Sequence, residues 1–455
     1  MNNQDLIARS RAALWHPCTQ MKHLEDLPPL PIARGEGSWL IDHDGRRYLD
    51  AISSWWVNLF GHAEPRINAA LMDQLGRIEH VILAGCTHAP VVELSERLSR
   101  LTGLGHAFYG SDGASAIEIA LKMSFHYWKN RGQPDKTGFV SLKNGYHGET
   151  LGALSVTDVA LFKDTYAPLL RPTHQVMSPD WRQAVPGESA EDCARRAAAD
   201  LEAYLRIHAD TTAALILEPL VQGAAGMAMY HPLYLRLARA LCDRHAVHLI
   251  ADEIAVGFGR TGTFFACEQA PAIPSQTPSA QGGGGRARVA DIADFICLSK
   301  GITGGYLPLS VVLCRDEIYA AFYDDTTTRG FLHSHSYTGN PLACRAALAV
   351  LDIFETDDVL AANRTKAERL GELLRPVAAH PRVTHFRHTG MIWAFEVADA
   401  AAGFSREFHR RALELGVFIR PIGDTVYFMP PYILDEAQMQ LLADVALKLL
   451  DGARS

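Results

Sequence analysis

Short apolar runs alternate with amphipathic stretches through the middle of the chain. The runs contain few polar positions, which is typical of strands covered on both faces. They are 138–142, 213–217, 247–251, 294–298 and 309–313. Helical stretches such as 114–130 and 232–245 lie between several of them. Strands that alternate with helices predict an α/β domain with a mostly parallel sheet covered by helices.

The pattern changes near both ends of the chain. From about residue 345 it reads helix, strand, helix, strand, and it ends in a helix at 435–451. This predicts a smaller α+β domain, which we expect the N-terminal residues to join. The segment 270–290 is rich in Pro, Gly, Ser and Gln, so we expect a flexible surface insertion there. The predicted boundaries are 1–60 for the N-terminal segment, 61–340 for the large domain and 341–455 for the small domain.

Length and charge fit an ordinary globular enzyme of two domains. The 455 residues are 48% hydrophobic and 21% charged, which is enough to bury a large core. The net charge is -8, with both signs scattered and no long basic run. This argues against a nucleic-acid partner or an anionic membrane surface. We therefore expect small-molecule substrates.

The cysteines and the N-terminus indicate a reducing compartment. The eight cysteines are widely spaced, with no C-x-x-C pair and no zinc-type Cys/His spacing, so most should be buried thiols. The N-terminus lacks the apolar core of a signal peptide. No run approaches the ~20 apolar residues that span a bilayer. We expect a cytoplasmic protein.

Reactive side chains follow the predicted strands. Ligands of open α/β sheets lie beyond the carboxyl ends of the strands, so the residues that follow each run are candidates for a site. They are Tyr146, His147, Glu218, Asp252, Glu253 and Lys300. This group predicts a site at one edge of the sheet.

Lys300 and Asp252 suit a pyridoxal 5'-phosphate (PLP) site. Lys300 precedes a glycine-rich stretch, which leaves room for a cofactor held as a Schiff base. A nearby aspartate can keep a pyridine nitrogen protonated, which makes the ring an electron sink. Lys300 could then act as the proton shuttle, with its pKa tuned down towards ~7 to 8. Taken alone, Lys300 could also be a surface lysine in a turn.

Two further segments could hold phosphate or stack on a ring. Gly113 and Ala114 open the helical stretch that begins after Asp112, and free amides at a helix start bind phosphate. The same residue types also serve as ordinary helix caps. Tyr146 lies in a glycine-flanked turn, where its ring could lie flat on a cofactor. An aromatic residue in a turn can equally be a packing residue.

A glycine pattern after Asp252 invites a different interpretation. Gly257, Gly259 and Gly262 form G-x-G-x-x-G, the fingerprint of dinucleotide-binding folds. That fingerprint should open a helix directly after a strand. The residues that follow, GRTGTFFACE, have no helical periodicity. A nucleotide-dependent oxidoreductase therefore remains only a rival reading.

Four motifs together resemble the class III, fold type I PLP aminotransferases. They are DEIAVGFGRTG, SKGITGG, SDGASAIEIALK and GYHGETLGALS, and the resemblance covers nearly the whole chain. It implies a PLP cofactor bound covalently by Lys300, with Asp252 at the pyridine nitrogen. Tyr146 would stack on the ring, and the amides of Gly113 and Ala114 would hold the phosphate. The implied catalytic residues are Lys300, Asp252 and Tyr146.

Other segments resemble members of that family that work in biotin biosynthesis. They are LWHPCTQM, ISSWWVNLFGH, EPLVQGAAGMAMYHP and RPIGDTVYFMPPY. The resemblance implies ping-pong transfer of an amino group from S-adenosyl-L-methionine to 8-amino-7-oxononanoate, giving 7,8-diaminononanoate. Trp55, Trp56, Tyr146 and Arg420 would bind substrate. Tryptophan rings suit the alkyl chain, and a guanidinium suits the carboxylate.

Two segments depart from the family pattern. Cys18 stands where the better-known pattern has tyrosine, which puts the amino donor in question. The resemblance also implies a homodimer with active sites at the subunit interface, where Ser336 keeps a hydroxyl in register with a phosphate-binding threonine. The nearby His333 and His335 could suggest a metal, but no third ligand lies at a useful spacing. We expect no metal.

Two other activities stay open beside the oxidoreductase. One is another class III omega-aminotransferase, which uses ornithine, 4-aminobutyrate or a diamine. The other is a PLP-binding regulator without turnover. Such a regulator normally carries a DNA-binding domain, and the sequence has no helix-turn-helix or basic segment.

Overall fold

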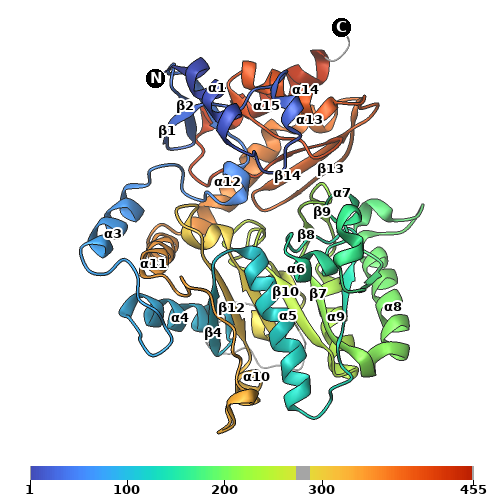
Figure 1. Cartoon of the computed structure of the whole chain (residues 1–455). Helices are drawn as coiled ribbons and strands as arrows, with labels where there is room; N and C mark the ends of the chain where they lie inside the picture. Colours follow the sequence, from blue (N-terminus) through green and yellow to red (C-terminus); the bar gives the residue numbers. More distant parts are fainter. Residues whose placement is uncertain (1, 273–286, 453–455) are drawn as a thin grey trace. The chain divides into compact units, whose positions relative to one another are not determined.

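The computed structural model describes residues 2–272 and 287–452. The chain divides into two compact units, a larger one of residues 69–360 and a smaller one of residues 1–68 together with 361–455. The smaller unit is therefore built from both ends of the chain, blue and red in Figure 1. The boundaries of these units fall later in the chain than residues 60 and 340, and helix α11 (Pro341–Thr356) belongs to the larger unit.

A seven-stranded sheet forms the centre of the larger unit, with the order β4-β12-β11-β10-β7-β5-β6. Its strands are β4 (His106–Gly110), β5 (Gly138–Leu142), β6 (His174–Val176), β7 (Thr212–Leu217), β10 (His248–Asp252), β11 (Phe295–Leu298) and β12 (Ser310–Cys314). Strand β12 is antiparallel to both neighbours, whereas the pairs among β11, β10, β7, β5 and β6 are parallel. The predicted mostly parallel sheet is confirmed. The five predicted apolar runs correspond to β5, β7, β10, β11 and β12, while β4 and β6 were not predicted.

Helices cover this sheet on both faces. Every residue of β7 and β10 is buried, so neither face of these strands meets solvent. Helix α5 (Gly113–Asn130) packs against β4, β12, β11, β10 and β7, and it crosses in front of the sheet in Figure 1. Besides α11, the described helices of this unit include α4 (Ala89–Thr102), α6 (Leu151–Val156), α8 (Ala190–His208), α9 (Leu233–Arg244) and α10 (Asp316–Ala320). Predicted helices 114–130 and 232–245 correspond to α5 and α9.

A buried ion pair anchors the amino end of β11. Asp294 precedes the strand, and its carboxylate accepts hydrogen bonds from Arg239 Nη1 at 2.7 Å and from the Leu249 amide at 2.7 Å. Arg315 Nε lies 3.1 Å from the other carboxylate oxygen. Burial alone would raise the pKa of Asp294, but Arg239, His248 and Arg315 hold it below its usual value. This cluster serves the fold, because it lies at the end of the strands opposite to Asp252.

The smaller unit contains two sheets. In the first, of order β1-β2-β3-β15, the strands β1 (Ile32–Glu36), β2 (Trp39–Asp42) and β3 (Arg47–Asp50) are antiparallel, and β15 (Val417–Phe418) is parallel to β3. The second contains β13 (Val383–Thr389), β14 (Ile392–Val397) and β16 (Thr425–Phe428). Its helices include α1 (Asn3–Ala13), α2 (Ser53–Trp56), α14 (Phe404–Glu414) and α15 (Glu436–Asp451). The pairing of β3 with β15 therefore connects the N-terminal and C-terminal parts of the chain within this unit.

A few elements complete the fold. Helices α3 (Pro65–Leu75) and α12 (Val359–Leu373) each contain a boundary between the units. The short elements are α7 (Ala160–Lys163), α13 (Arg375–Ala378) and the strand pair β8 (Val221–Gln222) and β9 (Ala228–Met229). Within the described residues, no helix combines the length and apolar character needed to cross a bilayer.

The predicted insertion is only partly described. Residues 273–286 lie outside the described residues. Next to this gap, Ala270, Ala287 and Val289 are buried, whereas Pro271, Ala272 and Arg288 are exposed. The flexibility of the segment stays a prediction. A 3-10 turn at Val289–Asp291 leads into the strand that follows. The three buried side chains pack in the larger unit. The Pro- and Gly-rich sequence around them gave no sign of this burial.

Candidate active site

The carboxyl ends of three neighbouring strands bring the predicted site residues to one edge of the sheet. Asp252 ends β10, Glu218 follows β7, and Lys300 comes two residues after β11. The register places them at similar levels, since Ala251 pairs with Leu217 and Asp252 pairs with Cys297. The parallel sheet thus assembles an amine and two carboxylates that are far apart in sequence.

Asp252 is nearly fully buried and is fixed by two donors. Its Oδ2 lies 2.7 Å from His147 Nδ1, and its Oδ1 accepts the Ile254 amide at 3.1 Å. An ionised carboxylate can only accept, so His147 carries its proton on Nδ1. The His147 amide in turn donates to Thr157 Oγ1 at 2.9 Å. The two donors therefore fix the orientation of the Asp252 carboxylate.

Glu218 holds the turn that carries Tyr146. Its two carboxylate oxygens accept the amides of Tyr146 and Gly223, each at 2.9 Å. Burial raises the pKa of Glu218 to about 7, and the nearby Asp252 adds to this effect, while His147 opposes it. Glu218 therefore positions the backbone of this turn through its two hydrogen bonds.

Lys300 has the backbone and the charge state of a functional lysine. Its φ is 48°, in the left-handed region, where a non-glycine residue costs about 1–2 kcal/mol. Such strain persists where the surroundings impose it and clusters at functional sites. Burial lowers the pKa of Lys300, although Asp252 and Glu218 act in the opposite direction. A lowered pKa increases the neutral, nucleophilic form of the amine.

The first turn of α5 lies against this group. The Asp112 side chain caps the helix by accepting the Ser115 amide at 2.9 Å, so the cap does not use the amides of Gly113 and Ala114. Amides at the start of an 18-residue helix favour an anion. A Cβ added to Gly148, whose φ is +121°, would lie 2.7 Å from the Ala114 Cβ. The helix start and the turn after Tyr146 are therefore in direct contact.

Tyr146 is partly buried beside this helix start. Its ring centroid lies 5.4 Å from that of Phe162, with a 60° tilt, and its hydroxyl donates to Glu149 Oε1 at 2.8 Å. Glu149 and Thr157 support Tyr146 and His147, but neither was singled out from the sequence. Both lie within or just after the GYHGETLGALS motif, so the motif was the available signal. Stacking of the Tyr146 ring on a cofactor stays a prediction.

These residues fit the functional groups of PLP. The start of α5 offers amides for a phosphate, and Asp252 offers a buried carboxylate for a pyridine nitrogen. Lys300 offers an amine with a lowered pKa for the aldehyde carbon. The three features belong to elements that contact one another, because a Cβ on Gly113 would lie 3.1 Å from Ile254 Cγ2. The larger unit thus offers a partner for each of these three groups of the cofactor.

The glycine pattern after Asp252 does not build a dinucleotide site. Residues 253–265 contain no α-helix, and the next helical segment is the 3-10 helix Ala266–Gln269. Glu253 closes the loop by accepting the amides of Ala266 and Cys267 at 2.9 and 2.8 Å. Burial raises the pKa of Glu253 to about 7. The loop is therefore closed by its own hydrogen bonds, and the glycine pattern does not support a nucleotide-dependent oxidoreductase.

The proposed substrate residues of the smaller unit form an unusual turn. Residues 53–56, which we call the tryptophan turn, all have left-handed φ values of 50°, 46°, 74° and 73°. Each such residue costs about 1–2 kcal/mol in the absence of compensation. The Trp55 side chain is 42% exposed and its ring lies 5.1 Å from the Arg420 Cζ. Trp55 and Arg420 are thus exposed together.

Trp56 faces the other way. It is 5% exposed, and its Nε1 donates to the Tyr427 hydroxyl at 3.1 Å. Burial raises the pKa of Tyr427 to about 12, so this phenol stays neutral. Within the smaller unit, Trp56 anchors the tryptophan turn, and its contact with substrate stays a prediction.

The histidines before Ser336 contact a lysine. His333 Nδ1 lies 2.9 Å from Lys122 Nζ, and its Nε2 lies 3.1 Å from His335 Nε2. The described residues contain no group of three or more potential metal-ligating side chains. Ser336 is exposed in the turn that follows. Cys18, at the departure noted in the sequence, is also exposed.

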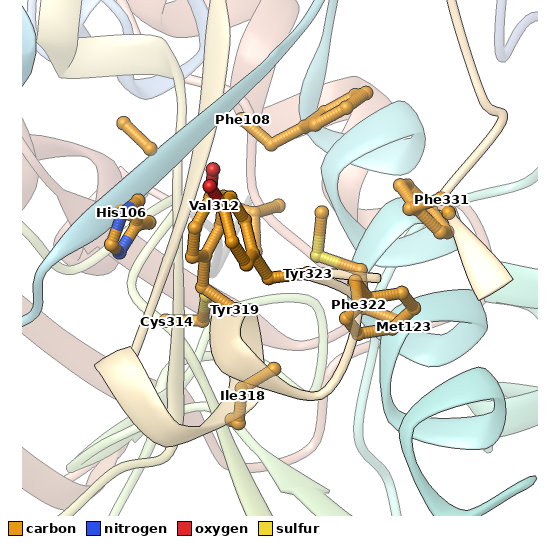
Figure 2. Close-up of a pocket in the computed structure, with 12 residues that line it drawn as sticks. His106, Phe108, Met123, Val312, Cys314, Ile318, Tyr319, Phe322, Tyr323 and Phe331 are labelled. Carbon is orange, nitrogen blue, oxygen red and sulfur yellow. The ribbon is translucent and has the colours of Figure 1, made fainter. Parts of the chain in front are cut away.

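A cavity of about 310 Å³ lies elsewhere in the larger unit. His106, which starts β4, and Cys314, which ends β12, both line it, so it lies at the edge of the sheet away from Asp252. Figure 2 shows that aromatic rings, including Phe108 and Phe331, surround it. Burial raises the pKa of Cys314 to about 12, so its thiol is not a ready nucleophile. The cavity contains none of the predicted site residues.

Comparison with known proteins agrees with this geometry. The family model described as aminotransferase class-III matches residues 20–450 of this chain. An adenosylmethionine-8-amino-7-oxononanoate aminotransferase of Helicobacter pylori is 42% identical, covering all of both chains. The crystal structure of an enzyme of that name from Methanocaldococcus jannaschii is 34% identical, with a TM-score of 0.89 and coverage of 99% of this chain and 100% of that chain. A PLP-bound amine transaminase from an uncultivated Pseudomonas species is 32% identical, with a TM-score of 0.85 and coverage of 97% and 98%. The chain belongs to the class-III aminotransferase family.

Proposed function

We propose that this protein is a PLP-dependent aminotransferase of biotin biosynthesis. It transfers an amino group from S-adenosyl-L-methionine to 8-amino-7-oxononanoate and gives 7,8-diaminononanoate. The observation that carries the chemistry is Lys300, whose pKa is lowered and which lies at the same sheet edge as Asp252. The full-length relatives that carry this enzyme name support the choice of substrates.

The cofactor would be held by residues of the larger unit. The amides of Gly113 and Ala114 would take the phosphate, Asp252 the pyridine nitrogen and Lys300 the aldehyde carbon. When bound, PLP stabilises negative charge at the substrate carbon by drawing electrons into its ring. Asp252 would pair with that ring nitrogen, and His147 orients the carboxylate through the 2.7 Å hydrogen bond.

Lys300 would supply proton transfer once a substrate amine has released it. Its lowered pKa favours a neutral Nζ that would take a proton from the substrate carbon and pass it to the cofactor. Glu218 contributes by holding Tyr146 through the backbone, which keeps that ring beside the helix start. Donor and acceptor would use the same residues in turn, which gives ping-pong kinetics.

The smaller unit would recognise the substrate. The keto acid has an alkyl chain that ends in a carboxylate, and Trp55 and Arg420 provide an aromatic face and a guanidinium side by side. An aromatic face also attracts the sulfonium of adenosylmethionine. Trp56 of this unit and Tyr146 of the larger unit are the other two residues for which we propose substrate contacts.

We also propose that the enzyme is a cytoplasmic homodimer. Ser336 is exposed, and it lies between Leu332 and Tyr337, whose large apolar side chains are 79% and 65% exposed. A second copy that covers this segment would bury these side chains and bring Ser336 to its partner's phosphate. Six of the eight cysteines are buried free thiols, which suits a reducing compartment.

Product analysis tests the proposed reaction. Purified enzyme supplied with PLP, adenosylmethionine and 8-amino-7-oxononanoate should give 7,8-diaminononanoate by mass spectrometry. Parallel reactions with ornithine, 4-aminobutyrate or a diamine as donor should be slower. Turnover of one of those donors without any diaminononanoate would assign another omega-aminotransferase. No half-reaction with any amine would instead favour a PLP-binding regulator.

A further inference from the structure

Asp50, at the end of β3, is a buried carboxylate that four donors surround. Its Oδ1 accepts the Ser54 amide at 2.9 Å and, at a longer 3.4 Å, the Ile52 amide. Its Oδ2 accepts the Ser54 hydroxyl at 2.7 Å and lies 3.1 Å from His62 Nε2. Three of these four groups belong to the backbone or side chains at and beside the start of the tryptophan turn.

His62 is itself held in place, so it can brace the carboxylate. Its backbone exchanges two hydrogen bonds with Gly37, at 3.1 and 2.6 Å. Its Nδ1 lies 3.3 Å from the side-chain Nδ2 of Asn58, and the side-chain Oδ1 of Asn58 accepts the Gly61 amide at 2.7 Å. Because Asn58 Nδ2 can only donate, His62 Nδ1 accepts and His62 Nε2 carries the proton that Asp50 accepts.

The tryptophan turn needs such support. Ser53, Ser54, Trp55 and Trp56 all adopt the left-handed conformation, which the Cβ of an L-residue disfavours, and no glycine relieves it. The Ser53 hydroxyl donates to the Met429 carbonyl at 2.8 Å, and Trp56 is fixed by Tyr427. Between these two anchors, Ser54 is held by Asp50, and Trp55 directs its ring to Arg420.

We infer that Asp50 and His62 are positioning residues for substrate recognition, which act by holding the tryptophan turn so that Trp55 lies over the Arg420 guanidinium. This inference rests on the proposed role of Trp55 and Arg420 in binding the keto acid. Neither Asp50 nor His62 touches the reacting atoms in this account. Their loss should therefore weaken binding of the acceptor and leave the chemical step largely intact.

The test uses Asp50→Asn in the full-length, PLP-loaded enzyme. Asparagine has nearly the same volume as aspartate, but it places an NH2 group where Oδ2 accepted hydrogen bonds. This NH2 group cannot accept from the His62 and Ser54 donors. We expect KM for 8-amino-7-oxononanoate to rise at least about tenfold, since one hydrogen bond to a charged group commonly accounts for that factor. The value of kcat should change less than about threefold. Ser54→Ala removes one donor and should raise the same KM about threefold.

A structural readout and a matched control separate positioning from general damage. Asp42 of the smaller unit is also buried, and it accepts the amides of Asp44 and Arg46 and the Tyr48 hydroxyl. Asp42→Asn should leave KM for the keto acid within about twofold.

The change in tryptophan fluorescence caused by Asp50→Asn should disappear in a Trp55→Phe background. An unchanged KM and fluorescence in Asp50→Asn, or equal rises in KM in Asp50→Asn and Asp42→Asn, would overturn the inference. If the unmodified enzyme made no diaminononanoate, the proposed function would be wrong. The fluorescence comparison would then still test whether Asp50 holds the tryptophan turn.

Discussion

The two units differ in how they hold their candidate site residues. At the sheet edge of the larger unit, Asp252 is buried and fixed by His147, and only one residue of the group, Lys300, has a left-handed backbone. In the smaller unit, four consecutive residues of the tryptophan turn are left-handed, and Trp55 and Arg420 are exposed. Burial suits groups whose charge state must be controlled. Exposure suits groups that must meet a substrate. Loss of a buried group of the larger unit should therefore reduce kcat. Loss of an exposed group of the smaller unit should raise KM.

Substitution of Lys300 should have the largest effect. Lys300→Ala removes the amine that holds the cofactor and moves the proton, so transamination should fall by at least about 10³-fold. Initial rates of diaminononanoate formation measure this loss. Lys129→Ala, at an exposed lysine near the end of α5, is the control and should keep the normal rate. Full activity in Lys300→Ala would contradict the assignment.

Substitution of Asp252 should follow. Asp252→Asn keeps the shape but removes the charge opposite the ring nitrogen, so kcat should fall about 10²-fold, as when one preorganised electrostatic partner is lost. KM for both substrates should change little. Steady-state kinetics with both substrates varied separate the two constants. A pure KM effect would show that the division between the two units is wrong.

Substitution of Arg420 should produce the opposite pattern. Arg420→Ala removes a charge-assisted partner of the substrate carboxylate, so KM for 8-amino-7-oxononanoate should rise about 10- to 100-fold. The cofactor absorption spectrum should stay the same. Arg410→Ala is the matched control, because Arg410 is an arginine of α14 that pairs with Glu407 and Glu414. If Arg420→Ala lowered kcat with an unchanged KM, substrate recognition by Arg420 would be excluded.

Asp294 offers a stability counterpart to Asp252 with the smallest kinetic effect. Asp294→Asn removes the buried one of the two carboxylates that pair with Arg239 and leaves only the exposed Asp243, so the free energy of unfolding should fall by about 3–5 kcal/mol. The value of kcat at a temperature where the protein is folded should stay within about twofold. Denaturant unfolding and kinetics on the same preparation measure both quantities. A loss of kcat comparable with that of Asp252→Asn would remove the distinction between a structural and a functional buried carboxylate.

The same aspartate gives a prediction for pH. Because the pKa of Asp294 is lowered in the folded protein, the ionised carboxylate stabilises the fold above its unfolded pKa of about 3.9. That contribution is lost as the pH falls through the folded pKa. Asp294→Asn should therefore lose less stability than the unmodified protein between pH 5 and about 3. Parallel acid-unfolding curves would contradict this assignment.

The sequence predicted the sheet edge better than the tryptophan turn. Apolar runs located β5, β7, β10, β11 and β12, and parallel strands bring the residues after them together by topology alone. The hydrogen bond between His147 and Asp252 was not predictable, because it depends on how the turn after β5 folds back towards β10. The left-handed turn was invisible, since Ser-Ser-Trp-Trp contains no glycine and its support comes from Asp50 and His62. Strand β6 was missed because it has only three residues, and β4 was missed because His106 and Gly110 at its ends interrupt the apolar run.

The central claim is that Lys300 is the residue that holds PLP. It is tested most directly by reducing the PLP-loaded protein with borohydride, digesting it and locating the fixed cofactor by mass spectrometry. We expect the added mass on the peptide that contains Lys300, and its loss when adenosylmethionine is supplied before reduction. Attachment to a different lysine, or no attachment in protein that is active, would contradict the role of Lys300.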